Sequence, residues 1–463
     1  MTWASLGVRI GGLAVLLPIV LPRLAAPEVL VWQMLSTITL LTTWADFGFS
    51  PTFARVIAFA RGGGNLADLH MPLASRKRLH EPDCQLSVGA VIAAQRQVYR
   101  RLIVGAMILA AIGGTTTLLR PVSSLSDPAQ GWIAWMLTLG SCLLQLLNGA
   151  ATAVVTGFDR VADTRRRDAV LGALQLTTAA LVALAGGKLV AIVSCYLVWQ
   201  IPLYLLNWWQ ARGLSAVAPE TVADRERDVL IAIWPAAWRS GVGILMSAGI
   251  IQASGLVYAQ FATPAAAAAY LLAMRAITAA SQISQAPFYS KLPALARLRA
   301  ERRNDDLLKL ATRGMVLAQW SFVVGALGVM FVAPYLLHMI GSSVSLPGFT
   351  MLALLSAAFF VERYSSMHIQ LYSLTNHIVW HIANGVTGLL MIALFLVLRP
   401  LIGELAMPAA MLGAYGGFCA WFASRLSLRS LQINRASFEW RTTAGPTVIL
   451  LSAIIFGALL RAK

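Results

Sequence analysis

The sequence is poor in charged residues, and acids are the rarest of them. Only 12% of its 463 residues are charged, with 19 Asp and Glu against 36 Lys and Arg. Soluble domains carry about 25% charged residues, whereas this chain is 58% hydrophobic and has a mean hydropathy of +0.71. The composition excludes an ordinary soluble protein and predicts an all-α polytopic membrane protein. No soluble basic face for nucleic acid is expected, so the formal net charge of +17 indicates membrane topology.

Cysteine pairs, metal-binding motifs and long polar loops are also lacking. The cysteines Cys84, Cys142, Cys195 and Cys419 lie far apart and form no CxxC pair. We therefore expect no disulfide framework, no metal and no cofactor. The connections predicted outside the membrane are short, the longest being about a dozen residues around "PVSSLSDPAQ". An enzyme that works outside the membrane usually needs a larger loop for its acids and bases, so we expect no enzymatic activity.

What the chain does contain is a series of apolar stretches long enough to cross a bilayer as helices. A hydrocarbon core takes about 20 apolar residues. The first stretch lacks a basic segment ahead of it and contains Arg9, which favours a membrane span over a signal peptide. The thirteen predicted spans are 4–22, 28–49, 101–119, 131–155, 168–186, 189–209, 229–257, 264–289, 315–339, 348–372, 378–398, 404–424 and 445–460.

The distribution of basic residues predicts the orientation of these spans. Lys and Arg accumulate in cytoplasmic connections. The connections after spans 2, 4, 6, 8 and 12 carry 26 of the 36 basic residues. We therefore expect a cytoplasmic N-terminus.

A short phrase occurs twice and predicts an internal repeat. The stretch "PTFARVIAFAR", residues 51–61, returns as "PFYSKLPALAR", residues 287–297, after span 2 and span 8 respectively. A shift by six helices preserves orientation, which is typical of parallel repeats around an axis along the membrane normal. Pro27 and Pro264 likewise begin the second helix of each half, a position where proline loses no hydrogen bond. We predict two six-helix lobes, 1–210 and 229–424, flanking a central cleft and joined by a linker at 211–228, with one extra helix in 425–463.

Four arginines fall inside the predicted spans: Arg9, Arg239, Arg275 and Arg363. Each costs roughly 2.5–3.5 kcal/mol at the centre of a helix that faces lipid. Arg239 and Arg275 lie about 15 Å into their spans at about 1.5 Å per residue, near the midplane. We expect these two to line an aqueous cleft that selects anions. For Arg9 and Arg363, extension to the membrane surface is the alternative.

Polar partners for these arginines are few. Apart from acids at the first residue of a span, Asp46 and Glu362 are the only acids inside spans. Adjacent helical residues point about 100° apart, so we expect Glu362 not to neutralise Arg363. The side chains of Ser281, Gln282 and Gln285 occupy one helical turn, where they either bind sugar or join helices by hydrogen bonds. The histidines of spans 10 and 11 either relay protons or are simply packed or solvated, and we favour the second interpretation for His368, His377 and His381.

Three phrases resemble the MOP superfamily, specifically its polysaccharide transporter branch of Wzx-type flippases. They are "WQMLSTITLLTTWADFGFSPTFARVIAFARGG", "AAWRSGVGILMSAGIIQASGLVYAQ" and "AYLLAMRAITAASQISQAPFYSKLPALARLRAE". The resemblance implies a bacterial inner-membrane flippase that turns a lipid-linked oligosaccharide on polyprenyl diphosphate toward the periplasm, for O-antigen or exopolysaccharide assembly. It also implies membrane lipids, a polysaccharide polymerase and a chain-length regulator as partners, and no nucleic acid.

Within this resemblance, the arginines would bind the diphosphate or an acidic sugar, and the polar turn of span 8 would bind the oligosaccharide. The alternative on the same fold is a cation-coupled small-molecule exporter. Drug exporters of the superfamily commonly carry a membrane-embedded acid in the first lobe, whereas span 1 here contains Arg9 and no acid. This departure disfavours the exporter.

The two acids inside the spans predict how transport is energised. If Glu362 or Asp46 couples transport to an ion gradient, Glu362→Gln or Asp46→Asn will abolish the dependence of the transport rate on that gradient, because the neutral amide cannot bind the ion. Transport measured in vesicles with and without an imposed gradient tests this. An unchanged gradient dependence in both variants would eliminate both residues as coupling sites.

Overall fold

The structure, a computed structural model, describes residues 16–63, 86–216, 229–231, 234, 241–243, 245–301, 303–374, 379–432 and 434–461. Within these ranges every regular element is a helix, which confirms the all-α class. Eight helical stretches among them are long and apolar enough to cross a membrane. The chain is therefore a multi-pass membrane protein. Span 1 of the prediction lies largely outside the described residues, and of span 7 the part from 245 to 257 is described continuously, as η5 and most of α10.

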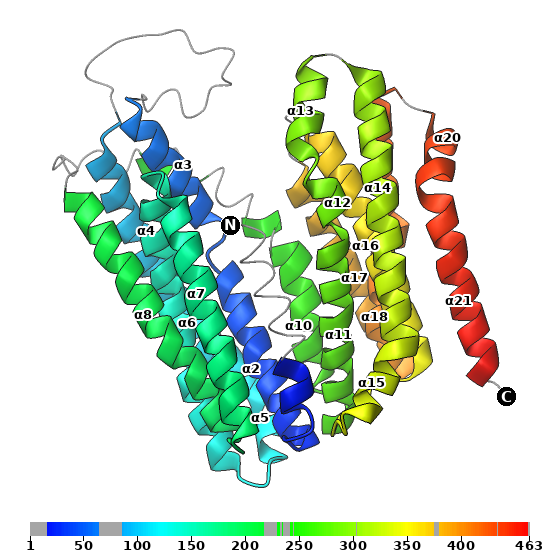
Figure 1. The fold of residues 1–463 in the computed structure, drawn as a ribbon, viewed down its shortest axis with the longest axis horizontal. Coiled ribbons are helices and arrows are strands. Elements are labelled where there is room, and N and C mark those ends of the chain that lie inside the picture. Colours follow the sequence, from blue (N-terminus) through cyan, green and yellow to red (C-terminus); the bar gives the residue numbers. More distant parts are fainter. Residues whose placement is uncertain are drawn as a thin grey trace. The chain divides into compact units, whose positions relative to one another are not determined.

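The chain divides into two compact units, Met1–Leu245 and Met246–Lys463. The predicted linker falls at 211–228, of which 217–228 lie outside the described residues, so that boundary stays a prediction. In unit 1, α6 packs against α2, α3, α4 and α8 (Figure 1). The helices described here are α2 (Ala26–Trp44), α3 (Phe49–Arg61), α4 (Val88–Leu109), η4 (Ala110–Gly114), α5 (Thr115–Ser123), α6 (Pro128–Gly157), α7 (Val161–Leu184) and α8 (Leu189–Ala216).

Local sequence sets the ends of the unit 1 helices. Pro27 begins α2 as predicted, and the Glu28 carboxylate accepts a hydrogen bond from the backbone N–H of Ala25 at 2.9 Å. Between α7 and α8 the chain turns at Gly186, which has φ +87°, a conformation that favours glycine. The predicted bounds of spans 5 and 6, 168–186 and 189–209, leave only two residues between them, and the tight turn that these bounds require is confirmed.

Unit 2 is built around α14 and α16, which contact each other and α11. In Figure 1 these helices run side by side through the unit. Its first part contains η5 (Leu245–Gly249), where the two units divide, α10 (Ile250–Tyr258), α11 (Pro264–Ser284), α12 (Ala286–Tyr289), α13 (Leu292–Ala300), α14 (Asn304–Leu327), η6 (Gly328–Val332) and α15 (Ala333–Met339). Its second part contains α16 (Phe349–Ser373), α17 (Trp380–Ile402), η7 (Gly403–Leu405), α18 (Ala406–Ala414), η8 (Tyr415–Cys419), α19 (Ala420–Ser430), α20 (Arg435–Glu439), η9 (Trp440–Ala444) and α21 (Gly445–Arg461).

The helical stretch from Trp380 to Ser430 is a hairpin of two spans. It is 51 residues long, whereas about 20 helical residues cross a bilayer. The chain reverses at Gly403, which has φ +55°, and α17 then packs along α18. Spans 11 and 12 of the prediction correspond to the two arms.

The repeated phrase folds differently in the two units. Its first copy is one continuous helix, α3, whereas its second copy breaks at Ser290 and Lys291 between α12 and α13. Only the second copy has a further proline, Pro293, at the start of a helix, where it cannot continue the preceding hydrogen-bond ladder. The two copies are therefore similar in sequence but differ in local backbone structure.

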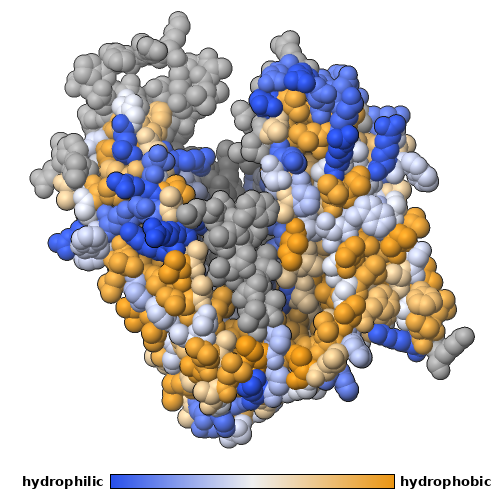
Figure 2. Space-filling view, in the orientation of Figure 1, coloured by the Kyte–Doolittle hydropathy of each residue, from blue (hydrophilic) through white to orange (hydrophobic). Residues whose placement is uncertain are grey.

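Apolar side chains cover the flanks of each unit, and hydrophilic side chains gather at one end of it (Figure 2). Leu109, Trp209 and Leu401 are each more than 70% exposed. Such exposure is typical of surfaces that face lipid.

The extra C-terminal helix packs along α16 between Tyr364 and Phe349. Near its start Glu439 contacts Tyr364 of α16, and at its end the guanidinium of Arg461 lies 4.5 Å from the ring centroid of Phe349, at the first residue of α16. A Cβ at Gly457 would overlap that same ring. The helix from Arg435 therefore runs antiparallel to α16 and starts earlier than the predicted span 445–460.

This pairing predicts that the two ends of the terminal helix lie on opposite sides of the membrane. Its 27 residues extend about 40 Å, more than the roughly 30 Å hydrocarbon core. We expect Arg435→Cys and Arg461→Cys to react with a membrane-impermeant maleimide from opposite sides, while the buried Leu450→Cys reacts from neither. Labelling of both ends from one side would refute the crossing.

Candidate functional site

The predicted site residues are distributed over both units. Arg9 and Arg239 lie outside the described residues. Asp46 belongs to unit 1, and Arg275, Ser281, Gln282, Gln285, Glu362 and Arg363 belong to unit 2. Within unit 2 the structure brings three of these together: Ser281, Glu362 and Arg363.

Arg363 of α16 is at the centre of a buried polar cluster. Its Nη2 donates a hydrogen bond to Ser281 Oγ of α11 at 2.6 Å and lies 3.4 Å from Glu362 Oε2. Glu362 Oε1 accepts a hydrogen bond from Ser366 Oγ, one turn farther along α16, at 2.6 Å. We call Ser281, Glu362, Arg363 and Ser366 the Arg363 cluster. It joins α11 to α16 by polar contacts.

The prediction that Glu362 would not neutralise Arg363 is wrong. The two backbone positions do point apart, but the long arginine side chain bends toward Ser281, and the carboxylate reaches the same point. The side chain of Arg363 is only 5% exposed and that of Glu362 is 18% exposed. Arg363 therefore does not extend to the surface of the unit, which eliminates the alternative of an interfacial arginine.

Two phenols complete the surroundings of this ion pair. Tyr289 of α12 and Tyr415 of η8 both interact electrostatically with Glu362 and Arg363. Tyr415 lies in a π-helical turn, a distortion that is frequent at functional sites. The cluster thus offers hydroxyl groups and a guanidinium in one small volume, the donors that an oxyanion needs.

The glutamines of span 8 do not contribute to this cluster. Gln282 is exposed, and Gln285 follows α11, where its backbone N–H caps the helix on the carbonyl of Ser281 at 3.2 Å. Arg275 is half-buried on α11, six residues before Ser281. Successive helical residues turn by about 100°, so Arg275 and Ser281 lie on different faces of α11.

Asp46 has a structural role within unit 1. Its Oδ2 accepts a hydrogen bond from the backbone N–H of Ser50 at 2.9 Å, and its Oδ1 accepts one from the Tyr99 hydroxyl of α4. The carboxylate therefore satisfies an otherwise unpaired amide in the first turn of α3 and ties that turn to α4.

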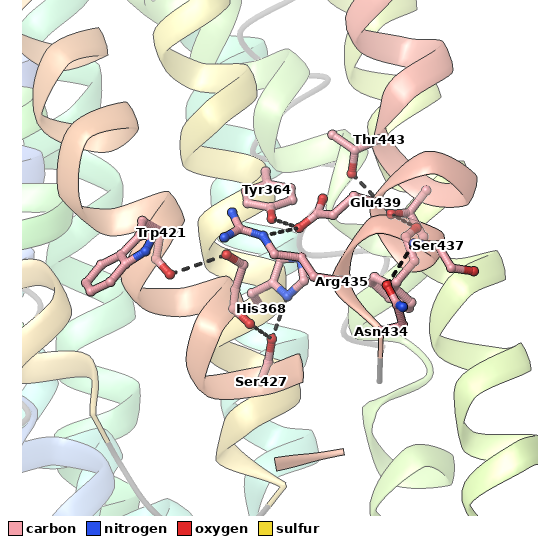
Figure 3. Close-up of polar contacts among 12 residues, drawn as sticks. Tyr364, His368, Trp421, Ser427, Asn434, Arg435, Ser437, Glu439 and Thr443 are labelled. Atoms are coloured by element: carbon pink, nitrogen blue, oxygen red, sulfur yellow. Dashed lines mark hydrogen bonds and ion pairs between the residues drawn. The ribbon is translucent and has the colours of Figure 1, made fainter. Parts of the chain in front are cut away.

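The structure adds a second polar cluster that the sequence analysis missed, around Glu439 (Figure 3). The Tyr364 hydroxyl donates to Glu439 Oε1, and Arg435 lies 3.8 Å from the same oxygen. Farther along the terminal helix, Thr443 Oγ1 accepts a hydrogen bond from Gln319 Nε2 of α14 at 3.1 Å. Glu439 was missed because the last span was predicted to begin at 445. Continuing the helical pattern back to Arg435 would have placed this acid on the helix.

His368 is packed at the edge of this second cluster. Its ring is fully buried, its Nδ1 lies 2.6 Å from Ser427 Oγ of α19, and its centroid is 4.5 Å from that of Tyr364 (Figure 3). The preferred interpretation as a packed histidine is confirmed. His377 lies outside the described residues, and His381 is half-buried in the first turn of α17.

Comparison with known proteins concerns the fold. The lipid II flippase MurJ in an inward closed conformation aligns with a TM-score of 0.57 and 12% identity over 94% of this chain and 94% of its own. An inward-facing multidrug resistance MATE family transporter of the MOP superfamily aligns with a TM-score of 0.64 and 12% identity, over 91% and 95%. No protein-family model matches the sequence, and no curated protein matches it. The chain has the fold of MOP superfamily transporters, as predicted.

The second cluster predicts that Tyr364→Phe loosens the terminal helix. The variant leaves the Glu439 carboxylate without its tyrosine donor, a loss of about 1–3 kcal/mol. We expect a lower midpoint of thermal unfolding in detergent, measured on the purified protein, and no change for Tyr335→Phe, whose side chain is 65% exposed. Equal midpoints for all three proteins would show that this hydrogen bond does not hold the helix.

Proposed function

We propose that this protein flips polyprenyl-diphosphate-linked oligosaccharide units from the cytoplasmic to the periplasmic leaflet of a bacterial inner membrane. The observation that carries the proposal is a buried arginine with unused hydrogen-bond donors in a fold that resembles a lipid II flippase. That neighbour, as its name states, is a flippase of lipid II. The finer assignment to O-antigen or exopolysaccharide assembly rests on the resemblance of the sequence phrases alone.

The chemistry of the Arg363 cluster supports an anionic cargo. A guanidinium carries five N–H donors and stays charged. In a membrane protein such a group is expensive and usually functional. Electrostatic attraction between the cluster and a phosphate is far stronger in the unit's low-dielectric interior than in water.

The remaining predicted residues keep their proposed roles. Arg9, Arg239 and Arg275 bind the diphosphate or an acidic sugar, and Ser281, Gln282 and Gln285 contact the oligosaccharide. Alternating access between two lobes moves the cargo without covalent chemistry, so the protein is a transporter and not an enzyme. Glu362 or Asp46 couples the transport cycle to an ion gradient. The N-terminus of the chain lies on the cytoplasmic side of the membrane. A polysaccharide polymerase and a chain-length regulator act on the flipped product.

A cation-coupled small-molecule exporter is the second candidate. It is favoured by the MATE family neighbour, whose TM-score of 0.64 exceeds that of the flippase. Cells that lack the protein discriminate the two functions, because only loss of an exporter makes them drug-sensitive while surface glycan stays normal.

The first test of the flippase is the position of its lipid-linked cargo in cells. We expect Arg275→Ala, like deletion of the gene, to accumulate polyprenyl-diphosphate oligosaccharide on the cytoplasmic leaflet and to reduce surface polysaccharide, because a cationic contact to the cargo is lost. Arg297→Ala, at an exposed arginine of α13, is the matched control and should behave as wild type. Normal glycan in the deletion strain would exclude this cargo.

A further inference from the structure

The hydrogen bonding of Arg363 is incomplete although the residue is buried. Nη2 has partners at Ser281 and Glu362, while Nε and Nη1 are buried without a partner of standard hydrogen-bond geometry among the described residues. The phenol of Tyr289 also interacts with the guanidinium, which still leaves donors unsatisfied. A buried donor that lacks a partner costs free energy. An ion pair that served only stability would be expected to satisfy more of the five guanidinium donors.

Glu362 is bound more tightly to Ser366 than to Arg363. The distance from Ser366 Oγ to Glu362 Oε1 is 2.6 Å, whereas Arg363 Nη2 and Glu362 Oε2 are 3.4 Å apart. Charge-assisted N–H to carboxylate bonds are usually about 2.7–2.9 Å long. Arg363 in turn is bound most closely by the Ser281 hydroxyl at 2.6 Å. The closest partner of each charged group is therefore a neutral serine hydroxyl, which we call its neutral anchor. The distance between the two charged groups is longer than either of these contacts.

We propose that Glu362 is an internal counter-ion of Arg363, which the anionic headgroup of the cargo, a phosphate or diphosphate ester, displaces. This inference rests on the proposed function and specifies how the same site is regulated. Without cargo, Glu362 compensates the buried guanidinium, whose isolation would be strongly destabilising. When cargo binds, its oxyanion takes the free donors of Arg363, and Glu362 stays on Ser366.

The two anions compete because they carry like charge beside one guanidinium in a low dielectric. Among the described residues, the phenols of Tyr289 and Tyr415 and, near Glu362, the thiol of Cys419 also interact electrostatically with the pair. No second cation among the described residues is paired with Glu362. Removing its charge therefore releases Arg363 for the cargo, and strengthening its hold on Arg363 does the opposite.

The test is the affinity of the purified full-length protein for farnesyl diphosphate, a short polyprenyl diphosphate, and for inorganic diphosphate, the headgroup alone. Isothermal titration in detergent gives both dissociation constants. We expect Glu362→Gln to bind both probes about tenfold more tightly, which is the effect of about 1.4 kcal/mol of relieved competition. Arg363→Gln should bind both at least tenfold more weakly. The exposed Glu301→Gln should match wild type.

A second variant changes affinity in the opposite direction and leaves both charges in place. Ser366→Ala removes the neutral anchor of Glu362, so the carboxylate turns to Arg363 and both probes should bind more weakly. Unchanged or weaker binding in Glu362→Gln would overturn the proposal, and so would unchanged binding in Ser366→Ala. If Glu362→Gln does not fold, the Ser366→Ala result decides alone. A gain limited to farnesyl diphosphate would also overturn it, because a charge competitor acts on the headgroup.

The outcomes separate this inference from the proposed function. If deletion of the gene blocks glycan export and wild type binds farnesyl diphosphate, but Glu362→Gln binds no more tightly, the flippase stands and the counter-ion is wrong. If deletion leaves surface glycan normal and wild type does not bind farnesyl diphosphate, both are wrong.

Discussion

The need to satisfy every backbone polar group without water governs this structure. In hydrocarbon an unpaired N–H or C=O costs several kcal/mol, and a helix pairs these groups within itself. Long helices follow, and their ends and turns need special residues. Pro27 and Glu28 start α2, and Gly403 reverses the chain between α17 and α18. The same demand explains why the apolar exterior needs no partner: lipid is its solvent.

The second constraint is the cost of placing charged side chains in the same apolar surroundings. Hydroxyl groups bind the charged side chains of the Arg363 cluster, Asp46 and Glu439. Ser281 and Ser366 hold Arg363 and Glu362, Tyr99 holds Asp46, and Tyr364 holds Glu439. A hydroxyl can donate or accept, so it stabilises a buried charge without adding another charge. It also leaves the charge exchangeable, which a tight ion pair would not. Under the proposed function Arg363 binds and releases an anion, which this property permits.

The extra C-terminal helix is held to unit 2 by polar contacts near its start and by apolar packing near its end. Near its start, Glu439 and Thr443 form hydrogen bonds with α16 and α14. Toward its end the contact is close packing of Gly457 and Arg461 on Phe349. Small residues and interhelical hydrogen bonds are the means by which helices associate in lipid. The helix is thus a part of unit 2, although its outer face is exposed.

The sequence by itself determined the membrane class, the helical fold, the tight turn at Gly186 and the helix starts at Pro27 and Pro264, because hydropathy and proline or glycine act locally. It also singled out Ser281, Glu362 and Arg363 as expensive or polar residues in apolar surroundings. It could not determine that they meet. Adjacent positions on a helix diverge by about 100°, and only the packing of α11 on α16 shows the arginine bending toward Ser281, with Glu362 following. Glu439 needed the tertiary structure for the same reason, since its partner Tyr364 lies on another helix.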